Sequence, residues 1–176
     1  MHKPVMVREL LEYLNPPAGG IVVDATVGAG GHARALAERI GRGGTLIALD
    51  RDAQMLALAQ QNLADILCPA YYIHTDYRNL PEVLKDLQIE AVDAILVDMG
   101  ICSEQLDDPE RGLAFRYDAP LDMRLDREQP FTAYHLLQRV RLPELMRILR
   151  EYGNEPWAKP IARAIIRRRN QGRMNT

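Results

Sequence analysis

The chain has 176 residues, which is enough for one domain with a hydrophobic core, or for one domain and part of another. Its 47% hydrophobic and 26% charged residues are typical of soluble globular proteins, and no apolar run or signal peptide predicts a membrane or secreted protein, so we expect a cytoplasmic one. A net charge of −2 gives no overall preference for nucleic acid, and Cys68 and Cys102 are predicted to be free thiols with no zinc-ligand cluster.

The first hundred residues alternate between helical and strand patterns. A helix is expected over residues 4–14. Short apolar strands follow, with a glycine turn and a helical pattern through Ile40 after the first of them. The strands are expected at 20–24, 45–50, 70–74 and 92–98, with later helices at 53–63 and 80–87. This alternation predicts an α/β fold with a Rossmann-like, doubly wound parallel sheet.

The pattern changes after Asp98. Residues 99–130 are rich in Asp, Pro, Arg and Gly without a clear period, and helices are expected over 132–137, 143–152 and 157–169. Trp157, at the start of the last helix, is expected in the core, with a base-stacking platform as the alternative. Because four strands make a small sheet, we expect the chain to be truncated before the last strands, which would follow Thr176.

The charge is unevenly distributed along the chain. Residues after 138 include ten Lys/Arg and only three Asp/Glu, so this segment carries +7 and the preceding part −9. A local basic stretch can bind phosphates even in an acidic protein. The alternative is a solvated helix face. The candidate RNA contacts in this segment are Arg163, Arg167, Arg168 and Arg169.

Acidic side chains follow each predicted strand. Asp24 ends the first strand, ahead of the glycine turn Gly28-Ala-Gly30-Gly31-His32, and Asp50 ends the second. Asp76 and Tyr77 follow the third strand, and Asp98 the fourth. Glycines between a strand and a helix let a ligand approach the backbone, and open α/β sheets bind ligands at the carboxyl edge of their strands. The four positions together therefore predict a ligand site at that edge.

Two cofactors compete for this site. The glycines also fit the loose dinucleotide fingerprint G-x-G-x-x-G/A, which makes an NAD-binding oxidoreductase the alternative. However, three residues separate Asp24 from Gly28, and the Asp24 carboxylate would repel a pyrophosphate. S-adenosylmethionine has no phosphate and carries an ammonium and a sulfonium, which carboxylates favour. The residues therefore favour a methyltransferase.

A second set of motifs makes a family resemblance specific. Asp98-Met-Gly-Ile-Cys-Ser-Glu-Gln105-Leu-Asp107 is followed by Arg111-Gly112 and by Pro120-Leu-Asp122-Met-Arg124. With His2-Lys-Pro-Val5, Asp24 to His32 and Asp50-Arg-Asp52, these segments resemble the ribosomal RNA small subunit methyltransferase H family. The resemblance runs from residue 2 to the end of the chain.

The resemblance implies an activity and a domain arrangement. The family transfers a methyl group from S-adenosylmethionine to the N4 amine of a cytidine in the decoding region of small-subunit (16S) ribosomal RNA. It implies a methyltransferase domain, here residues 1–105, and a helical RNA-recognition insertion, here 106–176, both incomplete. The partner would be the small-subunit rRNA or the assembled small subunit, with no membrane and no metal. By motif match, the cofactor-binding residues are Gly30, Gly31, His32, Asp50, Tyr77, Asp98 and Gln105.

The catalytic residues are less specified. Asp98 is a candidate acceptor for the amine hydrogens of the target base, and its alternative role is to hold the cofactor. Asp122 is a second candidate, with Arg124 as a contact to the base or RNA backbone. The alternative for this pair is an internal salt bridge that shapes the loop. A cofactor-binding module that has lost activity by truncation also remains open.

Overall fold

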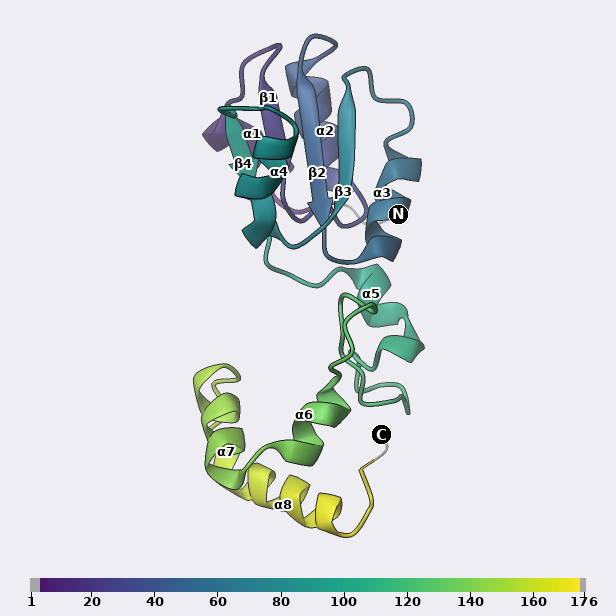
Figure 1. Ribbon diagram of the computed structural model, residues 1–176, viewed down its shortest axis with the longest axis vertical. Coiled ribbons are helices and arrows are strands. Elements are labelled where there is room, and N and C mark those ends of the chain that lie inside the picture. The colour runs from purple at the N-terminus through teal and green to yellow at the C-terminus, as the bar shows by residue number, and fades with distance from the viewer. Residues whose placement is uncertain (1–3, 175–176) are drawn as a thin grey trace. The chain divides into compact units, whose positions relative to one another are not determined.

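The computed structural model describes residues 4–174, and the chain divides into two compact units, Met1–Ser103 and Glu104–Thr176. Figure 1 shows the strands in the first unit and mainly helices in the second. Within the described residues, no helix is both long and apolar enough to cross a membrane.

The first unit is built on a four-stranded parallel sheet, as the alternating pattern predicts. The strands lie in the order β3-β2-β1-β4. Their bounds are β1 Ile21–Asp24, β2 Thr45–Asp50, β3 Ala70–His74 and β4 Ala94–Leu96. In the register of the sheet, Asp24 lies beside Leu96 on β4, and Asp50 lies beside His74 on β3. The carboxyl ends of all four strands therefore meet at one edge.

Helices cover both faces of this sheet. Figure 1 shows α4 in front of it and α2 behind it. The four helices are α1 Val7–Leu14, α2 Gly31–Ile40, α3 Ala53–Asn62 and α4 Leu80–Asp86. Alternate residues of β1 serve opposite faces: Val22 packs in the core beneath α2 and α3, and Val23 packs in the core beneath α4. Both valines are fully buried, as expected in a doubly covered parallel sheet.

Some element bounds differ from the predicted ones. The first helix begins at Val7 rather than residue 4, because Met6 has φ 57° and interrupts the helical backbone. The fourth strand is limited to three residues, Ala94–Leu96, where residues 92–98 were expected. In the described part of the sheet this strand pairs with β1 alone, and the Asp93 carboxylate accepts a hydrogen bond from the Ile21 amide at 2.8 Å.

The second unit begins with short elements and ends in a helical hairpin. The short helix α5 (Ser103–Asp107) and the 3-10 turn η2 (Pro109–Arg111) lie where only irregular chain was expected. Three helices follow: α6 Ala133–Arg139, α7 Leu142–Glu151 and α8 Ala158–Asn170. Val140, Leu145 and Ala162 form their buried core, which is separate from the two cores of the sheet.

Candidate functional site

The glycine turn after β1 is fastened to both neighbouring strands at the carboxyl edge of the sheet. The Ala25 amide donates to the Leu96 carbonyl at 2.9 Å, and the Val27 amide donates to the Leu49 carbonyl at 2.8 Å. Gly28 and Gly30 have φ of 51° and 89°, a conformation that side chains disfavour. The turn thus leads into α2 with its backbone held in one path, and a ligand can approach that backbone closely.

Asp50 anchors this turn from the end of β2. One carboxylate oxygen accepts from the Gly28 amide at 2.8 Å, and the other accepts from the Asp52 amide at 2.8 Å. Burial raises the pKa of the Asp50 carboxyl above its ordinary value, while these two hydrogen bonds oppose the shift. Each carboxylate oxygen has a second lone pair, so Asp50 can also accept from ribose hydroxyls.

Asp24 is the most deeply buried carboxyl group at this edge, with 1% of its surface exposed. Its pKa is raised from 3.8 to about 7, mainly by burial and also by the nearby charges of Asp50 and Asp98, while the hydrogen bond from the Thr26 amide and the charge of His32 oppose the shift. These side chains are therefore close enough to interact. A buried carboxyl that resists ionisation is complementary to a cationic group, which would restore its charged form, and not to a pyrophosphate.

Asp98 is joined to the same turn. Its backbone amide donates to the Thr26 hydroxyl at 2.7 Å, and the Thr26 amide donates to Asp24 at 3.2 Å. Asp98 itself is exposed. The structure thus brings Asp24, Asp50 and Asp98 together around the glycine turn, as the sequence predicts.

Asp76 and Tyr77 follow β3, and their side chains differ in how far they are available to a ligand. Asp76 caps the 3-10 turn η1 (Tyr77–Asn79) and forms an ion pair with Arg78 at 2.8 Å, which holds the pKa of Asp76 below its ordinary value. The Arg51 guanidinium lies 4.0 Å from the same carboxylate. The Tyr77 side chain is 38% exposed, so its ring is open to a planar ligand.

The His32 side chain contacts the segment before α1. Its Nε2 atom hydrogen bonds to the Val5 carbonyl at 2.8 Å. A Cβ on Gly31 would lie 3.0 Å from Pro4, so this glycine permits the close approach of the same segment. His32 and Gly31 therefore hold residues 4 and 5 against the start of α2. His2 and Lys3 of the opening motif lie outside the described residues.

Three predicted site residues lie in the first part of the second unit: one is a buried glutamine, and the other two form an ion pair. Gln105, on α5, is 6% exposed. Asp122 and Arg124 form a bidentate ion pair with N–O distances of 2.8 Å, which holds the pKa of Asp122 below its ordinary value. The Arg124 guanidinium also donates to the Arg127 and Gln129 carbonyls. This pair therefore shapes its own loop, whichever further contact it makes.

Arg111 organises this loop, a role that the Arg111-Gly112 motif did not predict. It is 1% exposed, donates to Asp108 at 3.2 Å and accepts from the Met123 amide at 2.8 Å through its carbonyl. The signal for it in the sequence is the Arg-Gly pair, since Gly112 has φ 63° and a Cβ there would overlap the Pro120 carbonyl oxygen. From the sequence alone, an arginine beside a glycine indicates a positive charge and does not indicate that the side chain is buried.

The four candidate phosphate-binding arginines on α8 differ in their surroundings. Arg169 donates to the Leu137 and Val140 carbonyls at 2.9 and 2.7 Å, at the end of α6. Arg163, Arg167 and Arg168 are exposed. Arg169 thus joins α8 to α6, while the other three place their positive charges on the surface.

Comparisons with known proteins identify a family over the whole chain. A family model described as the MraW methylase family matches residues 1–176. Among solved structures, an rRNA methylase from Clostridium thermocellum is similar, with 22% identity and a TM-score of 0.45, covering 58% of each chain. A SAM-dependent O-methyltransferase from Thermotoga maritima has 21% identity and a TM-score of 0.37, covering 42% of this chain and 29% of that one. Fibrillarin from Aeropyrum pernix, with bound S-adenosyl-L-methionine, has 19% identity and a TM-score of 0.41, covering 51% and 37%.

Proposed function

Because the chain belongs to the MraW methylase family, we propose that it methylates the N4 amine of a cytidine in the decoding region of small-subunit ribosomal RNA. This family is the small subunit methyltransferase H family that the sequence motifs resemble, so the predicted family is confirmed. Membership also confirms the Rossmann-like fold class and S-adenosylmethionine as the methyl donor. The chain spans 58% of the Clostridium thermocellum methylase, and the target nucleotide and substrate therefore remain part of our proposal.

The observation that carries the proposal is the buried Asp24 carboxyl beside the glycine turn. A cationic cofactor stabilises the ionised form of Asp24, whereas the pyrophosphate of NAD would be repelled by it. This charge preference supports the methyl donor over the dinucleotide alternative.

The remaining cofactor contacts follow from the same edge. We assign Asp50 to the ribose hydroxyls, the Tyr77 ring to the adenine, and the Gly30 and Gly31 backbone to close contact with the donor. Asp98, which the Thr26 hydroxyl holds at the glycine turn, is assigned to the amino acid or sulfonium end. Gln105 is assigned to the cofactor by motif match, and His32 acts through the segment that its side chain holds.

The reaction makes limited chemical demands on these residues. The cytosine amine forms a bond to the methyl carbon while the carbon–sulfur bond breaks, and the sulfonium becomes a neutral thioether. One amine proton then leaves to a carboxylate or to water. Because the amine lone pair is delocalised into the ring, holding it in line with the carbon–sulfur bond is the main contribution of the protein. Asp98 and Asp122 are the candidate acceptors for the amine hydrogens.

We further propose that residues 1–105 form the methyltransferase domain and residues 106–176 part of the helical RNA-recognition insertion. The compact unit that ends at Ser103 is compatible with this division. The target base must be unstacked to reach the donor. The proposed partner is the small-subunit rRNA or the assembled subunit, in the cytoplasm.

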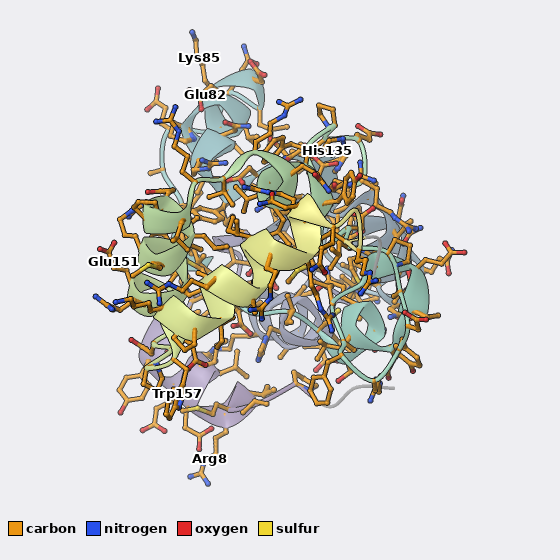
Figure 2. All side chains as sticks on the ribbon, turned by 90° about the horizontal axis from the view of Figure 1, so that it is seen from below. Arg8, Glu82, Lys85, His135, Glu151 and Trp157 are labelled. Atoms are coloured by element: carbon orange, nitrogen blue, oxygen red, sulfur yellow. The ribbon has the colours of Figure 1, made fainter. Side chains whose placement is uncertain are left out.

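Titration calorimetry with S-adenosylmethionine, S-adenosylhomocysteine and NAD tests the cofactor. We expect both adenosyl cofactors to bind and NAD to bind more weakly; preference for NAD would overturn the proposal. Asp50→Ala should weaken cofactor binding by about 1.5–3 kcal/mol, as expected for hydrogen bonds to a charged group. Glu82→Ala, on the exposed surface of α4, is the matched control (Figure 2).

Methyl transfer to small-subunit rRNA tests the activity. Incorporation of labelled methyl at a cytidine N4 position supports the proposal. Cofactor binding without any methyl transfer would leave a cofactor-binding module without methyltransferase activity.

A further inference from the structure

Trp157 lies on the outside of the second unit, although its position at a helix start suggested a core residue. It is the only tryptophan of the chain, and 69% of its surface is exposed. Figure 2 shows it at the beginning of α8, across the connection from Glu151 at the end of α7. An exposed indole loses the free energy that burial would provide, so its exposure indicates a surface that binds a ligand.

The backbone that carries this indole is fixed. The Trp157 amide donates to the Glu155 carboxylate at 2.7 Å, and its carbonyl accepts from the Ile161 amide at 3.1 Å. Ala158 and Ala162 of α8 are fully buried, and Ala162 belongs to the core of the second unit. The ring thus projects from a packed helix end and not from a loose loop.

A row of positive charges lies along the exposed surface of α8. Lys159, Arg163 and Arg167 are spaced four residues apart and are all exposed. None of the three has an ion-pair partner among residues 4–174, in contrast to Arg147 on α7, which pairs with Glu144 and Glu151. With a rise of about 1.5 Å per residue, the row extends roughly 12 Å.

We propose that Trp157 and the row Lys159, Arg163 and Arg167 form a binding surface for single-stranded RNA, with one base stacked on the indole and the phosphates along the cations. The combination of a rigid aromatic platform and unpaired cations is what such surfaces require. A protein partner would need a larger apolar area around the indole, and of the exposed side chains in the first two turns of α8, Lys159, Pro160 and Arg163, only Pro160 is apolar. This inference rests on the proposed function, which supplies RNA as the substrate.

Fluorescence of the single tryptophan reads this contact directly. Titration with a 12-nucleotide oligouridylate should quench the emission, because a stacked base contacts the ring. Inorganic polyphosphate is the control, since it can occupy the cations but has no base to stack, and it should leave the emission nearly unchanged. Binding of both polymers without quenching by the RNA would overturn the stacking contact.

Substitutions separate stacking from charge. Trp157→Ala should weaken oligouridylate binding about 5- to 150-fold without changing its salt dependence, and Trp157→Phe should retain most of the affinity. Arg163→Gln should lower the slope of log K against log salt by about 0.7 for one lost phosphate contact. Tyr13→Ala, which removes an 87% exposed aromatic ring from α1, is the control for nonspecific loss of apolar surface.

The outcomes distinguish this inference from the proposed function. Circular dichroism must show that each variant is folded, and cofactor affinity is measured separately by calorimetry. A folded Trp157→Ala variant that binds oligouridylate as tightly as the wild type would overturn the inference, and methyl transfer by the wild type would still support the proposed function. Quenching by RNA in a protein that binds no S-adenosylmethionine would support the RNA-binding surface and contradict the proposed function.

Discussion

Asp24 shows at the scale of one residue how binding can conflict with stability. A carboxyl group that is 1% exposed must either lose its charge or find a positive partner. Thr26 provides one hydrogen bond from its amide, and the pKa of Asp24 is still raised to about 7 by burial. An asparagine of the same shape would avoid this cost. The carboxyl is therefore best explained by a cationic ligand that needs it.

Replacing Asp24 should accordingly stabilise the folded protein and weaken the cofactor. The raised pKa means that the folded state holds a proton which the unfolded state has released, so wild-type stability falls as pH rises from about 4 to 7. One proton accounts for at most about 1.4 kcal/mol per pH unit. Asp24→Asn should remove this part of the pH dependence and be more stable than the wild type at pH 8.

Urea unfolding of both proteins at pH 5.5 and pH 8 measures the difference, and calorimetry measures cofactor affinity. Parallel stability–pH curves for the two proteins would contradict a raised pKa. Unchanged affinity for S-adenosylmethionine would show that the charge of Asp24 does not serve the cofactor.

His32 has a different role at the same scale, because its side chain holds a neighbouring segment. Its 2.8 Å hydrogen bond to the Val5 carbonyl ties residues before α1 to the start of α2. We expect His32→Ala to release this segment, seen as faster amide exchange at residues 5–8, and to increase the rate of cofactor dissociation. His32→Gln, which keeps an N–H donor, should restore most of both properties. Loss of cofactor binding with unchanged exchange at residues 5–8 would instead make the imidazole a direct ligand.

At the scale of elements, predictions succeed where the apolar pattern and the turn residues agree. The expected ranges of β2 and β3 match the structure residue for residue, because each is an apolar run ended by a polar residue at the sheet edge. The start of α3 is also readable, since Asp52 caps it by accepting from the Gln54 and Met55 amides. The five-residue helix α5 was missed, because one helical turn is too short for an apolar period.

The loop from Asp108 to Arg124 depends on contacts that no local pattern encodes. Arg111 is buried; its side chain pairs with Asp108, three residues before it, and its carbonyl accepts from the amide of Met123, twelve residues after it. Gly112 lies against the Pro120 carbonyl. The family resemblance marks these positions as a motif, but only the fold shows that they support the Asp122–Arg124 pair.

Gly112, the one glycine of this loop, should therefore not tolerate a side chain. Gly112→Ala adds a methyl group that overlaps the Pro120 carbonyl oxygen, at a φ of 63° that alanine disfavours. We expect a loss of more than about 1 kcal/mol in the free energy of unfolding of the second unit. Gly172→Ala is the matched control, because Gly172 has φ 68° but no atom within 4 Å of the added methyl group. Equal destabilisation by both changes would mean that backbone strain alone causes the loss of stability, and that the contact between Gly112 and the Pro120 carbonyl does not contribute to it.

At the scale of the whole molecule, the candidate site was only partly predictable. The sequence identifies Asp50 and Asp98 because strand ends of a parallel sheet must share an edge. It does not reveal that Arg169 donates to the carbonyls at the end of α6, or that Trp157 is exposed, because helix packing decides which side of α8 faces the core. Exposed and buried residues follow one another within each turn of a basic amphipathic helix, so the amino-acid composition of the segment does not show which of them face the core.

The separate cores of the two units predict separate responses to ligands. The buried residues beneath the sheet and those of the α6–α8 helices belong to different hydrophobic clusters, so each unit can gain protection without the other. S-adenosylmethionine at about 100 times its Kd should stabilise the state that binds it by about 2.7 kcal/mol.

Hydrogen exchange read by mass spectrometry should locate each response. With S-adenosylmethionine, slower exchange is expected in peptides that contain residues 24–32, 49–52 and 76–79, since their backbone forms the carboxyl edge of the sheet. With oligouridylate, it is expected in peptides from 156–168, because Trp157 and the exposed cations lie there. The Asp50→Ala variant should lose the first response and keep the second, while Trp157→Ala should show the reverse. Slower exchange of α6, α7 and α8 with the cofactor alone would contradict their independence, because it would mean that cofactor binding also orders the helical part of the second unit.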